Sequence, residues 1–136
     1  PSELETVRTT LFNLLNNFRA SNGLPRLTYS NHLQTVAQNW ANNGLRYYPD
    51  SAPAARAHNP NYRSQVGWSR SSELVIRNTG GANMNLTSLL HYMHNWWINS
   101  SNHRPWMLDP GYTHAGFGFV RGQTGTPWAV ALLGTP

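Results

Sequence analysis

The chain contains no cysteine and no lysine, and only five of its 136 residues are acidic. Without cysteine there is no disulfide framework, so the fold must depend on an apolar core. A chain of this length buries roughly two thirds of its unfolded surface, which is enough for such a core. The lack of cysteine suits a cytosolic protein and a bacterial extracellular protein equally, so it leaves the compartment open.

Long apolar runs are also missing. No stretch approaches the roughly 20 apolar residues that cross a bilayer, so no transmembrane segment is expected. All ten basic residues are arginine, and the net charge of +5 favours anionic partners such as envelope polymers. Because the arginines are scattered singly, nucleic acid is not an expected partner. The chain opens with Pro1 and not with Met, so we expect that an upstream segment, with any secretion signal, has been removed.

The spacing of apolar residues predicts three helices. The first spans about residues 3–21, the second runs from a cap at Ser30 to Gly44, and the third begins at a cap on Asn85 or Asn83. Their apolar faces include most of the tryptophans. We therefore expect core positions for Trp40, Trp96 or Trp97, Trp106 and Trp128, and exposed positions for Tyr47, Tyr48 and Trp68, with an aromatic cleft for sugar or lipid as the alternative.

The second half of the chain predicts a sheet. Residues 115–120 and 128–133 flank a turn rich in glycine and threonine, which is typical of a β-hairpin, and residues 73–76 read as a short strand. Residues 49–70 are predicted to form a long loop, and loops of that length are usually functional or disordered. Helices followed by strands, with no repeat or linker, predict one α+β domain over residues 1–136.

Because the chain has only five carboxylates, the candidate for a functional site can be found by elimination. Glu3 and Glu5 lie in the first turn of a helix, where acids complement the helix dipole. Asp109 precedes Pro-Gly and is expected to organise a turn, and Asp50 has no evident partner. Glu73 stands in an otherwise apolar segment, where a carboxylate needs a partner to offset desolvation. A structural ion pair and a role in a site both remain open for Glu73.

Two of the six histidines are the best site candidates. His58 lies in the long predicted loop and His103 follows the third helix, and neither position has a packing role of its own. His91 and His94 could share a metal at their i, i+3 spacing, but the neighbouring glutamate of a two-histidine zinc helix is missing. The chain has no Gly-x-Ser-x-Gly turn and no phosphate-binding loop, so no motif indicates nucleophilic catalysis.

Four stretches, in this order and spacing, resemble the CAP superfamily of cysteine-rich secretory, antigen 5 and pathogenesis-related proteins. They are residues 14–27, 33–41, 97–104 (Trp-Ile-Asn-Ser-Ser-Asn-His-Arg) and 107–118 (beginning Met-Leu-Asp-Pro-Gly-Tyr-Thr). The resemblance covers nearly the whole chain. It implies a three-layer αβα sandwich with a C-terminal antiparallel hairpin and an open cleft lined by two histidines and two acids.

The resemblance also implies which residues line that cleft. His58 and His103 match the two family histidines, and Glu73 matches the glutamate of the family's Gly-Glu-Asn motif, reduced here to Ser-Glu-Leu. The second family acid is missing, because residues 61–63 read Asn-Tyr-Arg, and this places Arg63 at the cleft. The family disulfides are missing too, as in many bacterial members. The cleft is therefore expected to be less anionic than that of a typical member.

Three functions follow from the resemblance. The favoured one is a secreted or envelope-associated module that binds a lipid or other small apolar ligand. The first alternative is a metal-dependent peptidase or wall hydrolase, in which His58, Glu73 and His103 would bind Zn²⁺ and activate water. The second is a non-catalytic envelope interaction module. Catalysis is the less favoured expectation, because such proteins look more like binding modules and one family acid is missing here.

Overall fold

The computed structural model describes residues 2–136. Its longer helices are α1 (Glu3–Ser21), α2 (Asn31–Asn43) and α4 (Leu86–Ile98), and its shorter ones are α3 (Tyr62–Val66), α5 (Arg104–Met107) and the 3₁₀ turns η1 (Leu45–Tyr47) and η2 (Ala54–Arg56). The strands are β1 (Thr28–Tyr29), β2 (Arg70–Arg77), β3 (His114–Arg121) and β4 (Pro127–Thr135). Among these residues no helix is both long and apolar enough to cross a membrane.

The strands form one mixed sheet in the order β1-β3-β4-β2. β3 and β4 make the predicted C-terminal hairpin, and β2 pairs antiparallel with the other edge of β4. β1 pairs parallel with β3 over two residues. β2 is longer than predicted, and its register places Glu73 opposite Leu132, in the middle of the strand.

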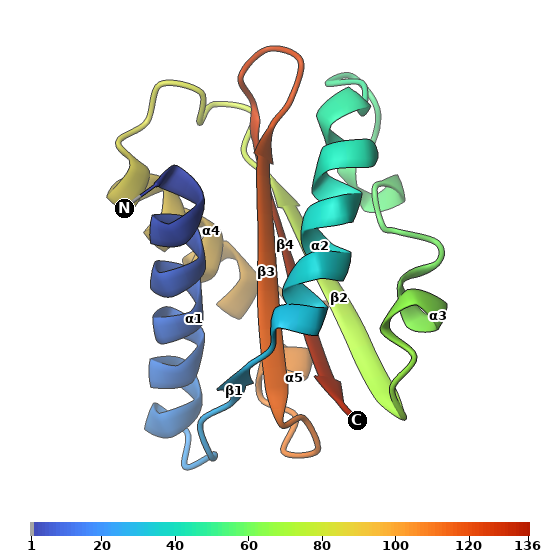
Figure 1. Cartoon of the computed structure of the whole chain (residues 1–136). Helices are drawn as coiled ribbons and strands as arrows, with labels where there is room; N and C mark the ends of the chain where they lie inside the picture. The colour runs from blue at the N-terminus through green and yellow to red at the C-terminus, as the bar shows by residue number, and fades with distance from the viewer. Residues whose placement is uncertain (1) are drawn as a thin grey trace.

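Helices cover both faces of this sheet, so the predicted three-layer αβα sandwich is confirmed (Figure 1). α1 and α4 pack on one face, where Leu11, Met93 and Phe117 belong to one apolar cluster. α2 packs on the other face, where Leu33 and Val130 belong to a second cluster. The alternation of side chains along the strands divides the core in this way, because successive residues point to opposite faces.

Each of the three long helices has a side-chain cap at its N-terminus, as expected for the polar residues at these positions. The hydroxyl of Ser2 accepts from the amide of Glu5 at 3.1 Å, and that of Ser30 accepts from Leu33 at 3.0 Å. The side chain of Asn85 accepts from the amide of Ser88 at 3.3 Å, so of the two predicted caps Asn85 is the one used.

The predicted core position is wrong for Trp106, which is 43% exposed, and is confirmed for Trp128. The prediction that Trp96 or Trp97 is a core residue is also confirmed, because Trp97 is buried and Trp96 is 47% exposed. Trp96 and Trp97 are neighbours on α4, so only one of them can face the sheet. Trp106 lies in the single turn of α5, which is too short for an apolar periodicity to predict.

The predicted loop over residues 49–70 is partly wrong, because it contains η2 and α3. Contacts from distant residues hold these short turns. The imidazole Nε2 of His32 lies 2.7 Å from the carbonyl oxygen of Val66 at the end of α3. The indole Nε1 of Trp40 donates to the carbonyl of Ala57 at 2.9 Å, just after η2. This segment therefore lies against α2 and carries His58 toward the sheet.

Candidate functional site

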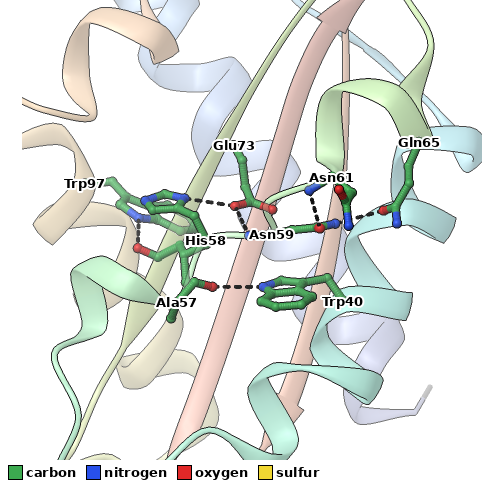
Figure 2. Close-up of polar contacts among 9 residues, drawn as sticks. Trp40, Ala57, His58, Asn59, Asn61, Gln65, Glu73 and Trp97 are labelled. Carbon is green, nitrogen blue, oxygen red and sulfur yellow. Dashed lines mark hydrogen bonds and ion pairs between the residues drawn. The ribbon is translucent and has the colours of Figure 1, made fainter.

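Glu73 is the buried centre of the candidate site. Its side chain is 1% exposed, and its Oε1 accepts a hydrogen bond from the backbone amide of Asn59 at 2.9 Å. The same oxygen lies 2.8 Å from Nδ1 of His58 (Figure 2). Such a carboxylate fixes the orientation of an imidazole and the ring nitrogen that carries its proton. Of the two alternatives that the sequence left open for Glu73, the structure shows the pairing with His58, and a role in a site stays a prediction.

Side-chain amides hold the segment that carries His58. The side chain of Asn59 donates to Oε1 of Gln65 at 2.8 Å and accepts from the amide of Asn61 at 3.0 Å (Figure 2). Ala57 is bonded to the indole of Trp40 on the other side. Because these bonds fix the backbone on both sides of His58, its ring has a defined position although its side chain is 45% exposed.

His103 reaches the same site from the other side, at the start of α5. Its Nδ1 lies 2.7 Å from the hydroxyl of Ser100, which leaves Nε2 as the free ring nitrogen. Its ring meets that of Trp96 edge to face, with the centroids 5.3 Å apart. Burial lowers the pKa of His103 from its ordinary value, and the nearby His58 lowers it further. The imidazole of His103 is therefore neutral at pH 7.

One pocket joins these side chains. His58, Glu73 and His103 line a hollow of about 310 Å³, whose walls also include Ala54, Ala55, Val75, Trp96, Asn102 and Trp106. That volume is within the range of small-molecule sites. Apolar and polar groups contribute almost equally to the wall, and the polar side chains are the two imidazoles, Glu73 and Asn102. We call this pocket the His58–His103 cleft.

Arg63 lies beside this cleft and not in it. It lines a neighbouring pocket of about 280 Å³ together with Arg70, Trp68 and Tyr112, and Trp106 is the wall that both pockets share. The guanidinium of Arg63 lies over the ring of Tyr62, 5.1 Å from its centroid. Arg63 could therefore meet only a ligand that extends past Trp106.

The predicted zinc ligands do not form a ready metal site. Within residues 2–136, no three His, Cys, Asp or Glu side chains are grouped so that they could hold a metal ion. Oε1 of Glu73 is engaged by His58 and Asn59, whereas Oε2 is buried without a hydrogen-bond partner. The zinc site over His58, Glu73 and His103 stays a prediction.

Sequence reasoning missed the aromatic walls of the cleft. Trp106 was assigned to the core, and Trp96 was one of two candidates for a core position, with Trp97 as the other. Trp96 and Trp106 are both exposed, and both line the cleft. A second pocket of similar size, about 350 Å³, lies between α1 and β1 and includes Arg8 and Phe12.

Comparison with known proteins supports this architecture. The sequence model of the family described as CAP, the cysteine-rich secretory protein family, matches residues 12–132. No curated protein sequence matches the chain.

Three solved structures share the fold. A cysteine-rich secretory protein from Staphylococcus aureus has a TM-score of 0.69 and 19% identity, over 99% of this chain and 40% of that one. An extracellular protein containing an SCP domain, from Bacillus anthracis, has a TM-score of 0.67 and 17% identity, over 98% of this chain and 41% of that one. An outer surface protein from Borrelia burgdorferi has a TM-score of 0.64 and 16% identity, over 93% of this chain and 90% of that one. The chain thus spans about two fifths of the first two proteins.

Proposed function

Because the chain belongs to the cysteine-rich secretory protein family, known as CAP, we propose that it is a secreted ligand-binding module. The ligand is a small, mainly apolar molecule held in the His58–His103 cleft. The observation that carries this proposal is the cleft itself, a hollow of about 310 Å³ that two imidazoles and several apolar side chains line together.

The chemistry of the cleft specifies the kind of ligand. Apolar walls from Val75, Trp96 and Trp106 suit an acyl chain or a ring system. The contact of Nδ1 with Glu73 leaves Nε2 of His58 available, and the contact with Ser100 does the same for His103. Two imidazole nitrogens can bond one hydroxyl or carboxyl group. The ligand therefore has one polar head and an apolar body.

An extracellular location is part of the proposal. The Staphylococcus aureus neighbour is described as secretory and the Bacillus anthracis neighbour as extracellular, and the Borrelia burgdorferi neighbour is an outer surface protein. The net charge of +5 adds an attraction to anionic envelope polymers, which would hold the module near such a surface.

The proposal is tested by calorimetry with decanol and decanoic acid, two probes with one apolar chain and different heads. We expect saturable one-to-one binding of at least one probe. His103→Ala should weaken it about threefold to tenfold, the value of one hydrogen bond. Trp106→Ala should weaken it further, because it removes an apolar wall. His91→Ala is the matched control, since His91 is exposed on α4 outside the cleft, and should change nothing.

Two results would overturn the proposal. One is no binding of either probe by the native chain. The other is the same affinity in the native chain, His103→Ala and Trp106→Ala, which would place the ligand elsewhere. Hydrolysis of a peptide or a wall fragment that stops with a chelator and with Glu73→Gln would instead favour the metal-dependent hydrolase.

A further inference from the structure

The solvent-facing side of α4 carries no formal charge. The helix Leu86–Ile98 contains no Asp, Glu, Lys or Arg, although a surface helix usually carries such residues on its outer face. Two large aromatic side chains are exposed there instead, Tyr92 at 50% and Trp96 at 47%. Asn95 and Asn99 are exposed as well. Packing in the core does not explain these aromatic and amide side chains, because the core lies on the opposite side of the helix.

These four residues form one stripe. Positions 92, 95, 96 and 99 follow the i, i+3, i+4, i+7 spacing of a single helix face. Tyr92 and Trp96 are one turn apart, with roughly 5–6 Å between Cβ atoms at that spacing. The two side chains are therefore neighbours on one face of the helix. Asn95 and Asn99 make a parallel row of amides, and the side chain of Asn99 donates to the carbonyl of Asn95 at 2.8 Å.

The stripe lines a hollow of about 540 Å³. Tyr92, Asn95, Trp96 and Asn99 form one side, and Ser100 and Ser101 close its end. None of these lining residues is charged, although the chain has a net charge of +5. Trp96 also lines the His58–His103 cleft, so the hollow and the cleft meet at this ring. We call the hollow the Tyr92–Trp96 groove.

The mixture of groups in the groove matches a sugar. A pyranose ring presents a face of C–H groups, which packs on an aromatic ring, and an edge of hydroxyls, which bonds amides and other hydroxyls. A nucleic acid would require basic residues, and none line the groove. An apolar lipid would leave the exposed side-chain amide of Asn95 without a partner.

We propose that the Tyr92–Trp96 groove binds an uncharged glycan, with one sugar stacked on Tyr92 and another on Trp96. This inference is separate from the proposed function, because Tyr92 and Asn95 lie outside the cleft that holds the apolar ligand. A glycan in the groove would pass the mouth of that cleft at Trp96.

The test is a titration followed by ¹H–¹⁵N NMR with chitopentaose, cellopentaose and maltopentaose. The chain has six indole N–H groups, and Trp96→Phe identifies the signal of Trp96. We expect saturable shifts of that indole and of the Asn95 and Asn99 side-chain amides with at least one of these three sugars. Tyr92→Ala should weaken binding at least tenfold. Tyr47→Ala is the matched control, because Tyr47 is 65% exposed on η1, and should bind normally.

Several outcomes would overturn the inference. They are the absence of saturable shifts with all three sugars, equal affinity in Tyr92→Ala and the native chain, or shifts that depend on protein concentration without sugar, which would assign the groove to self-association. The two proposals fail separately. A native chain that binds decanol or decanoic acid but none of the sugars contradicts only the groove, and a native chain that binds a sugar but neither decanol nor decanoic acid contradicts only the cleft.

Discussion

Replacing Arg19 by methionine should destabilise the fold strongly. Arg19 is fully buried at the end of α1, and its guanidinium donates three hydrogen bonds to backbone carbonyls. Nε bonds Pro25 at 3.0 Å, and Nη1 bonds both Met107 and Asp109 at 2.9 Å. One side chain thus ties α1 and the connector after it to the end of α5, the helix that begins beside His103.

The magnitude follows from those three bonds. Arg19→Met leaves three carbonyls without their partner, at about 1–3 kcal/mol for each that stays buried. Relief of the desolvation that lowers the pKa of Arg19 offsets part of this loss. The net loss should be about 3–5 kcal/mol, a large share of the roughly 5–15 kcal/mol that stabilises such a domain. The melting temperature should fall by roughly 10–20 °C.

Urea unfolding followed by circular dichroism measures the loss. Arg26→Met is the matched control, since Arg26 is exposed and donates one hydrogen bond to the side chain of Asn17, and it should change stability by less than about 0.5 kcal/mol. A loss below about 1 kcal/mol for Arg19→Met, close to that of the control, would refute the idea that this guanidinium holds the two segments together.

Two further predictions concern the core. Gly118→Ala should cost about 1–3 kcal/mol in urea unfolding, because the new Cβ would lie 2.7 Å from the backbone of Ala37 on α2; Gly80→Ala, with 3.8 Å of room, should cost almost nothing, and equal costs would contradict the close packing. Burial lowers the pKa of His94 to about 4, so the folded state resists protonation. Its contribution is complete above pH 6.5 and is lost as the pH falls toward 4, so stability should drop by about 2–3 kcal/mol between pH 7 and 4.5. This drop should shrink in His94→Gln, and an unchanged drop would contradict the assignment.

The long elements could be predicted from local signals. The helix predicted over residues 3–21 is α1, and the caps at Ser30 and Asn85 are used as predicted. These signals lie within a few residues of each other, in apolar spacing and capping side chains. The hairpin of β3 and β4 was visible for the same reason.

The short elements and part of the site could not be predicted in this way. α3 and η2 depend on contacts with α2, such as the bond from Trp40 to Ala57, which no local pattern reveals. The contact between His58 and Glu73 joins residues 15 positions apart across a strand edge, so the sequence could name both without pairing them. The exposure of Trp106 depends on the orientation of α5, and a helix of four residues is too short for its sequence to predict that orientation. Arg63 is on α3, and Trp106 separates it from the cleft.

The most direct test of the His58–His103 cleft is a crystal structure of the chain with whichever of decanol or decanoic acid binds. We expect the polar head of the probe within hydrogen-bond distance of Nε2 of His58 or His103. The carbon chain of the probe should lie between Trp96 and Trp106. A probe found instead in the pocket of Arg8 and Phe12 between α1 and β1, with the cleft filled only by water, would contradict ligand binding in the cleft.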